Sequence, residues 1–249
     1  MWTRAQLKAN AKTALKTRYG IAIVVSLLAG MLSGSSPSLG TSVFTGTFNA
    51  GSGDVEKMKD FFTTNAEVSG VLLILFFLAA ASGVIFGIFV SAPIAVGQDR
   101  FYLQNRLGQG DIGTLFSGFQ PGYLNVVKVV FLKNLYIFLW SLLFVIPGII
   151  KTYEYHMVEY ILAENPHMDS ARALEISREM MRGHKLDTFI LRLSFFGWSI
   201  LSVMSCGIGF LFLMPYIQAT FAELYTALRE KAIAEGTVTF EELTGVRAF

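Results

Sequence analysis

Five ionisable side chains lie in stretches of this sequence that are otherwise apolar enough to enter a membrane. Lys151, Glu154, His156 and Glu159 fall within one 17-residue stretch, and Lys133 lies in the apolar stretch before it. An ionisable group inside a bilayer is costly unless a partner, a cavity or the interface satisfies it. We therefore treat these five residues as a candidate intramembrane polar cluster.

The spacing of these residues suggests two ion pairs. Lys151 and Glu154 are three residues apart, so they can pair on one helix. Lys133 and Glu159 lie at similar depth if the two apolar stretches form neighbouring antiparallel helices. Three interpretations stay open: structural pairing inside a helix bundle, a helix that lies partly in the interface, or a path for protons or substrate.

The composition indicates an integral membrane protein. Of 249 residues, 53% are hydrophobic and 15% charged, whereas a soluble protein has about 25% charged residues. The net charge of +2 excludes a strongly basic nucleic-acid-binding protein. The expected partner is therefore the lipid bilayer, and no nucleic acid is expected.

The distribution of charge predicts six membrane-spanning helices. A hydrocarbon core of roughly 30 Å requires about 20 residues of helix. The chain has 31 uncharged residues between Glu67 and Asp99, and 30 between Arg192 and Glu223. With a return helix after the turn pair Pro147-Gly148, the expected spans are about 19–36, 69–97, 121–146, 149–165, 187–206 and 209–228.

Basic residues fix the expected orientation. Five of them precede the first span, and four follow the fourth span, whereas residues 37–67 carry four acidic and two basic residues. Cytoplasmic loops of membrane proteins carry an excess of Lys and Arg. We expect a single multi-pass domain, residues 1–249, in the cell membrane, with both termini cytoplasmic and 37–67 external.

Two further helices are expected outside the bilayer. In residues 3–18, Lys8, Lys12 and Lys16 recur every four residues, which is typical of an amphipathic helix whose basic face contacts anionic lipid. Residues 169–183 predict a cytosolic amphipathic helix, capped by Asp169 or Ser170. Its mixed charges suit a solvated face, and the alternative is a docking site for a cytosolic protein partner.

The apolar side of the cytosolic helix is expected to carry Ala171, Leu174, Ser177 and Met181.

Two glycine pairs have the spacing that lets helices approach closely. They are Gly30 with Gly34, and Gly83 with Gly87. Contact between spans of the same chain is the simpler interpretation, and dimerisation is the alternative.

Enzymatic motifs are absent from the sequence. It contains no P-loop, no H-E-x-x-H pair and no G-x-S-x-G elbow, and its three histidines are not clustered. We therefore expect no catalytic residues, no cofactor and no metal site.

Several segments resemble one bacterial membrane-protein family. They are 146–151 (IPGIIK), 160–166 (YILAENP) and 173–187 (ALEISREMMRGHKLD), together with the N-terminal basic pattern and the late Gly207-Ile208-Gly209. The chain is similar to the family named domain of unknown function 975. The resemblance implies a small multi-span bacterial protein without assigned activity, and it carries over no site residues.

The sequence thus predicts an all-α polytopic membrane helix bundle that acts as a non-enzymatic scaffold or regulatory component. The alternative is a transporter or permease-like subunit that uses the polar fourth span. A third hypothesis is a membrane-embedded enzyme built on Glu154, His156 and Glu159.

Overall fold

The chain is all-helical in the part that the structure describes. The structure is a computed structural model that describes residues 2–16, 18–33, 70–71, 74–75, 77–78, 82–83, 85–205 and 207–245. The expected external segment 37–67 and Gly34 lie outside these residues.

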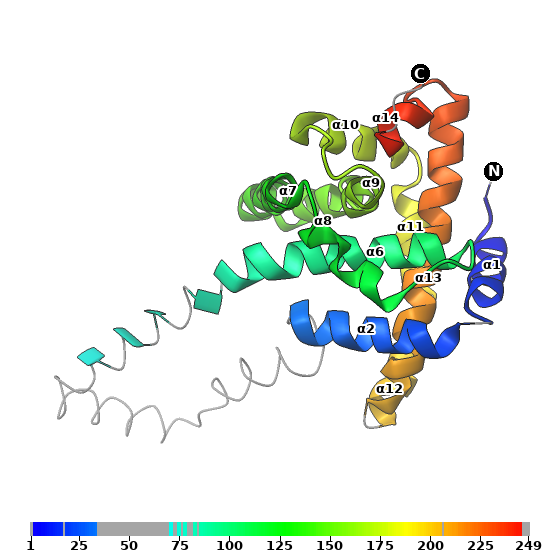
Figure 1. The fold of residues 1–249 in the computed structure, drawn as a ribbon, viewed down its shortest axis with the longest axis horizontal. Helices are drawn as coiled ribbons and strands as arrows, with labels where there is room; N and C mark the ends of the chain where they lie inside the picture. The colour runs from blue at the N-terminus through cyan, green and yellow to red at the C-terminus, as the bar shows by residue number, and fades with distance from the viewer. Residues whose placement is uncertain are drawn as a thin grey trace.

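The elements follow one another as short and medium-length helices (Figure 1). The first part contains α1 (Arg4–Lys16), α2 (Tyr19–Ser33), the π-helical turn η1 (Gly87–Ser91), α6 (Ala92–Asn105) and the 3₁₀ helix η2 (Ile112–Phe119). The second part contains α7 (Tyr123–Leu143), α8 (Val145–Glu154), α9 (Val158–Glu164), α10 (Ser170–Met180), α11 (Lys185–Leu193), α12 (Phe196–Met204), α13 (Ile208–Ala234) and α14 (Phe240–Thr244).

Three helical segments among the described residues are long and apolar enough to cross a membrane. They are Tyr123–Leu143, Lys185–Met204 and Ile208–Ala234, and a fourth is obtained if α1 and α2, which are bent by 101°, count as one broken span. By length and composition, these segments are compatible with a membrane protein. The sequence predicted six spans, and the structure supports three to four by length and composition.

The expected return span 149–165 is two short helices rather than one. α8 and α9 are separated by a break at residues 155–157, and together they run back along α7. The chain reverses at Phe144, whose backbone is extended, and not at Pro147-Gly148. Pro147 lies in the first turn of α8, where its missing N–H costs no helical hydrogen bond.

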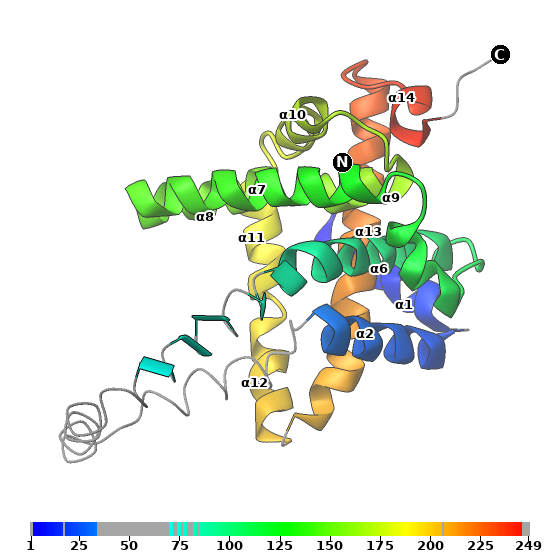
Figure 2. The ribbon, with the colours of Figure 1, turned by 60° about the vertical axis from the view of Figure 1, so that its left-hand side comes forward.

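Two helical hairpins, α7–α8 and α12–α13, project from the body of the molecule (Figure 2). Their tips are apolar and open, with exposed fractions of 74% at Leu142 and 77% at Met204. The base of the molecule is closed, because α7 buries its first turns and α13 buries its C-terminal half. The exposed apolar surface is thus concentrated on the hairpins.

Both hairpins are closed by the same kind of contact. A Cβ on Gly148 would overlap Ser141, and a Cβ on Gly209 would overlap Ser202. Each serine donates its hydroxyl to the carbonyl four residues earlier, at 2.8 Å. The two helices of each hairpin therefore meet at backbone distance, one turn from the tip.

The region after the second predicted span is largely helical, and its buried side chains are mostly in α6. Arg100, Arg106 and several glycines predict a polar inside loop from Asp99 to Gly122. Instead, α6 continues to Asn105 and η2 packs against it. A Cβ on Gly97 would overlap the carbonyl of Leu115, and a Cβ on Gly118 would overlap that of Pro93. The two glycines permit backbone-to-backbone packing, which a polar-loop interpretation of glycine overlooks.

The N-terminal segment forms a helix with one buried side, as predicted, and contact of its basic face with lipid stays a prediction. α1 buries Leu7, Ala11 and Leu15 against the body, mainly α13, and the Thr3 hydroxyl accepts from the backbone N–H of Gln6 at 3.3 Å. Lys12 and Lys16 are exposed, whereas Lys8 is half-buried and donates to Ser194 Oγ at 2.7 Å.

The expected cytosolic helix is α10, and Asp169 caps it by accepting from Ala171 N at 3.0 Å. Its buried side carries Ala173, Ile176, Ser177 and Met180, whereas the Ala171 expected there is exposed. The buried stripe is shifted because α10 packs against α7, α9 and α13 at once.

Candidate functional site

Lys133 and Glu159 form an ion pair between α7 and α9, the short helix that follows the first hairpin. Lys133 extends from α7 and Glu159 from α9, and the exposed fractions of their side chains are 12% and 17%. The pair is largely shielded from solvent, so each charge depends on the other for compensation. The two residues meet at the depth that their spacing predicted.

Asp99 adds a second carboxylate to this pair. It lies in α6, is buried, and has Glu159, Lys133 and Tyr160 as its electrostatic neighbours. Sequence reasoning placed Asp99 at the start of a loop and missed it. The signal that could have found it is the continued helical pattern of apolar residues past Asp99 to Phe101 and Tyr102, both of which are buried.

Glu154 is held by two lysines. Its carboxylate accepts from Lys151 at 2.5 Å and from Lys185, which lies at the start of α11. The Lys151 ammonium also lies 5.3 Å from the centroid of the Trp140 ring, where it makes a cation–π contact. Glu154 and Lys185 thus join the first hairpin to the helix that leads into the second.

Ser177 of α10 bridges the break between α8 and α9. Its hydroxyl donates to the carbonyl of Glu154 at 2.8 Å and accepts from the N–H of Met157 at 3.2 Å. The side chain is fully buried. One hydroxyl therefore satisfies a donor and an acceptor that the interrupted helix leaves without partners.

Replacing Ser177 with Ala should destabilise the protein by about 1–3 kcal/mol, because it leaves both buried backbone groups unsatisfied. The measurement is the apparent melting temperature of the protein in mild detergent. Ser199→Ala is the matched control, because the Ser199 hydroxyl donates only to a carbonyl of its own helix region, Phe195 O, at 3.1 Å. Equal melting temperatures for the two variants would refute the bridging role of Ser177.

His156 does not join the carboxylates. Its ring stacks on Phe221 of α13, with 4.9 Å between the ring centroids. In the described residues, no hydrogen bond or ion pair links it to Glu154 or Glu159, and no three His, Cys, Asp or Glu side chains gather closely enough to hold a metal ion.

A second polar network lies on the C-terminal half of α13, and sequence reasoning did not find it. Glu164 accepts from the hydroxyl of Tyr225 at 2.7 Å and pairs with Arg229, while Tyr225 stacks on Tyr160 at 5.2 Å. These contacts join α9 to α13, so the base of the bundle is fastened by charge as well as by apolar packing.

Arg172 fastens the end of the chain to α10. It binds Glu242 of α14, with Nε 2.6 Å from Oε1, and this hydrogen bond holds the pKa of Glu242 below its ordinary value. The stabilisation that Glu242 contributes is therefore present at neutral pH and is lost as the pH falls through its lowered pKa.

Burial, followed by the positive charge of Lys231, lowers the pKa of the His184 imidazole.

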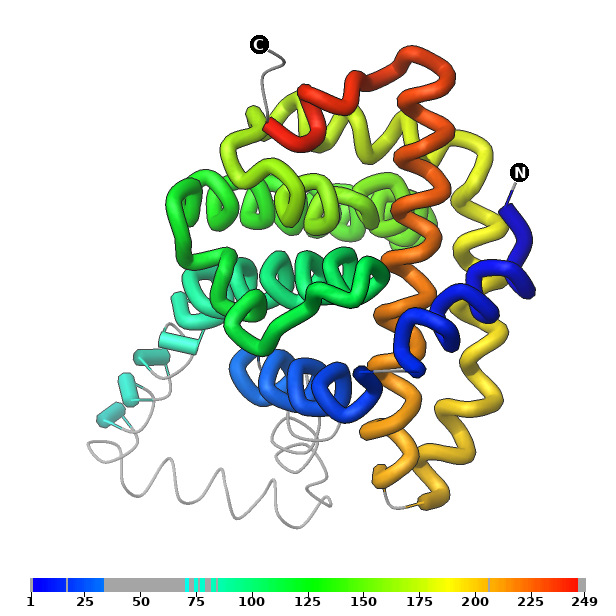
Figure 3. The backbone as a smooth tube through the Cα atoms, turned by 45° about the vertical axis from the view of Figure 1, so that its right-hand side comes forward, coloured from blue at the N-terminus to red at the C-terminus, as the bar shows by residue number. Residues whose placement is uncertain are grey.

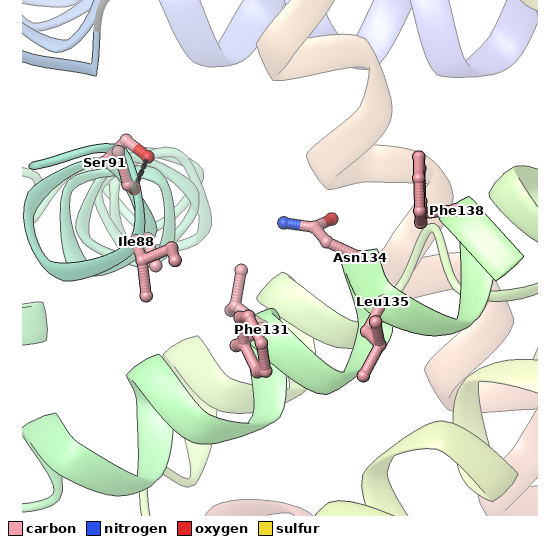
Figure 4. A pocket seen from close by; sticks show the side chains of 9 residues that line it. Ile88, Ser91, Phe131, Asn134, Leu135 and Phe138 are labelled. Atoms are coloured by element: carbon pink, nitrogen blue, oxygen red, sulfur yellow. Dashed lines mark hydrogen bonds between the residues drawn. The ribbon is translucent and has the colours of Figure 1, made fainter. Parts of the chain in front are cut away.

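A cavity of about 430 Å³ lies between η1 and α7. Its lining is mostly apolar, and Asn134 extends toward it from α7 while Ser91 faces it from η1 (Figure 4). None of the five residues of the predicted cluster lines this cavity. The polar cluster and this cavity are therefore separate features.

Both hairpins and the helices that join them fall within one matching segment. Residues 123–232 match the family model described as protein of unknown function (DUF975). The resemblance of segments 146–151, 160–166 and 173–187 is confirmed, whereas the N-terminal basic pattern lies outside the match. The matching segment contains Lys133, Glu154, Glu159, Ser177 and Lys185, whereas Asp99 and α1 precede it. No match was found among curated proteins or among solved structures.

Proposed function

We propose that this protein is a non-enzymatic membrane scaffold or regulatory component whose charged core holds two apolar hairpins in a fixed arrangement. The observation that carries the proposal is the pairing of the charges. Lys133 is paired with Glu159, and Glu154 is held by Lys151 and Lys185. Each of the two carboxylates binds a cation on another helix, Glu159 to Lys133 and Glu154 to Lys185, so these charges connect elements.

The cavities support the same proposal. Three cavities in the described residues are lined by side chains other than those of Lys133, Glu154, His156 and Glu159. A transport path would require water or substrate to reach the charged groups. Charges that are paired with one another suit a structural role.

The proposal includes a cytosolic protein partner that would bind the outward side of α10. The apolar side of α10 is already covered by α7, α9 and α13. The outward side of α10 and of the turn after it is polar. Arg178 is exposed there, and the side chain of Arg182 is 80% exposed. A partner would therefore recognise charge, rather than insert an apolar helix.

The alternative, a transporter, is favoured by one observation. Asp99 and Glu159 place two carboxylates beside a single lysine in a buried position. Such an arrangement can hold a proton, which is a property of proton-coupled transporters.

Proteoliposomes separate the two functions. The purified protein is reconstituted with an internal pH-sensitive dye, and a pH gradient is imposed with valinomycin present to carry the compensating potassium. The scaffold proposal predicts that the gradient decays at the same rate in vesicles with the native protein and in vesicles with the Asp99→Asn variant. A faster decay that disappears in Asp99→Asn would support transport and contradict the scaffold.

A further inference from the structure

The largest of the three cavities lies between α1 and the second hairpin. It is a groove of about 800 Å³. Figure 3 shows α1, in dark blue, crossing beside the long helix α13 and the segment α11–α12. The groove belongs to neither the polar cluster nor the network of Glu164, and the scaffold proposal does not use it.

One wall of the groove is cationic. Lys8, Lys12 and Lys16 lie four residues apart on α1, and all three line the groove. Among the described residues, no acidic side chain lines the groove, and α1 contains none. Lys8 is positioned by a hydrogen bond to Ser194 Oγ at 2.7 Å, and its ammonium lies 4.4 Å from the Phe195 ring centroid.

The opposite wall is apolar and uncovered. Trp198, Leu201 and Phe212 line it, with exposed fractions of 62%, 60% and 54%. Tyr19 closes the end of the groove, because its hydroxyl donates to the carbonyl of Phe212 at 2.6 Å. The groove therefore has one cationic wall and one apolar wall, both within reach of a single bound molecule.

We propose that this groove binds one anionic phospholipid, with the phosphate on the lysines of α1 and an acyl chain on the wall formed by Trp198, Leu201 and Phe212. The complementarity has two parts. The lysines favour an anionic ligand. They belong to α1 and not to the apolar hairpin, just as a lipid headgroup lies outside the hydrocarbon layer. The apolar wall requires hydrocarbon, which a free phosphate ion lacks. Volumes of about 300–1,000 Å³ are usual for small-molecule sites, so the groove has room for a headgroup and part of a chain.

The test is native mass spectrometry of the full-length protein in detergent, titrated with phosphatidylglycerol or phosphatidylcholine. The native protein should retain one phosphatidylglycerol in preference to phosphatidylcholine. The variant Lys12→Gln/Lys16→Gln should bind phosphatidylglycerol at least fivefold more weakly, and Lys12→Arg/Lys16→Arg should keep the binding. These lysines are exposed, so their loss does not disturb the core.

The matched control is Lys128→Gln/Arg178→Gln, which removes two exposed cations from α7 and α10 and should bind as the native protein does. Leu201→Gln should weaken phosphatidylglycerol binding without a change in charge. Three results would overturn the proposal: equal loss in the control, unchanged binding in the α1 variant, or displacement of the lipid by millimolar inorganic phosphate, which would identify a site for free phosphate instead.

Discussion

Replacing Glu159 with Gln should destabilise the protein by about 3–5 kcal/mol, because the substitution leaves the Lys133 ammonium without its counter-charge in a shielded position. Lys133 is 12% exposed at its side chain, so water compensates it poorly. The apparent melting temperature in detergent and the amount of protein in the membrane should both fall. Gln has nearly the shape of Glu, so lost packing contributes little to this effect.

A double substitution tests whether the pair is structural. Lys133→Met/Glu159→Leu removes both charges and should recover much of the stability that Glu159→Gln loses, because paired buried charges are often replaceable by apolar side chains. Lys128→Met, at an exposed position on the same helix, should change little. If Glu159→Gln accumulates and melts as the native protein does, the pair has no structural role.

Gly97→Ala should have an effect of similar size, by a different mechanism. The added Cβ would overlap the carbonyl oxygen of Leu115, which belongs to the backbone of η2. A backbone group cannot move aside by side-chain rotation, so η2 must separate from α6. Overpacking a core typically costs about 1–3 kcal/mol, and a backbone clash places this variant at or above the upper end. Loss of folded protein on size-exclusion chromatography measures it.

Gly20→Ala is the control for Gly97→Ala. Gly20 lies in α2, and a Cβ there would have no other atom within 4 Å. Alanine has a higher helix propensity than glycine, so this variant should be as stable as the native protein or more stable. A comparable loss for both variants would show that the clash at Gly97 is not the cause.

The helices and the first ion pair could be predicted from the sequence because both depend on local spacing. The buried apolar residues of α1 recur every four residues. Lys133 meets Glu159 because the segment that contains Glu159 folds back along α7. The same reasoning could not find Ser177 or Lys185. Their partner is Glu154, which is more than 20 residues away, and only the tertiary path of α10 and α11 brings them to it.

The spacing of two glycines in the sequence does not by itself predict where helices pack closely. The pair Gly83 and Gly87 was expected to pack closely, but a Cβ at either position would meet nothing within 4 Å in the described chain. Whether they contact a second copy stays a prediction, as does a role for Gly30 and Gly34. Gly97 and Gly118 make the close contacts instead, because the position of η2 across α6 decides where backbone must approach backbone.

The tight serine–glycine tips of the two hairpins bear on how the protein is made. Residues 134–150 and 193–222 contain no Asp, Glu, Lys or Arg, and each includes a complete tip. A membrane-inserted hairpin ordinarily requires its connecting loop to be moved across the bilayer, and charged groups make that step costly. Here the turns are short and uncharged, and the helices already contact each other next to them. Each hairpin can therefore enter the lipid from one side as a closed unit, with its charged base left behind.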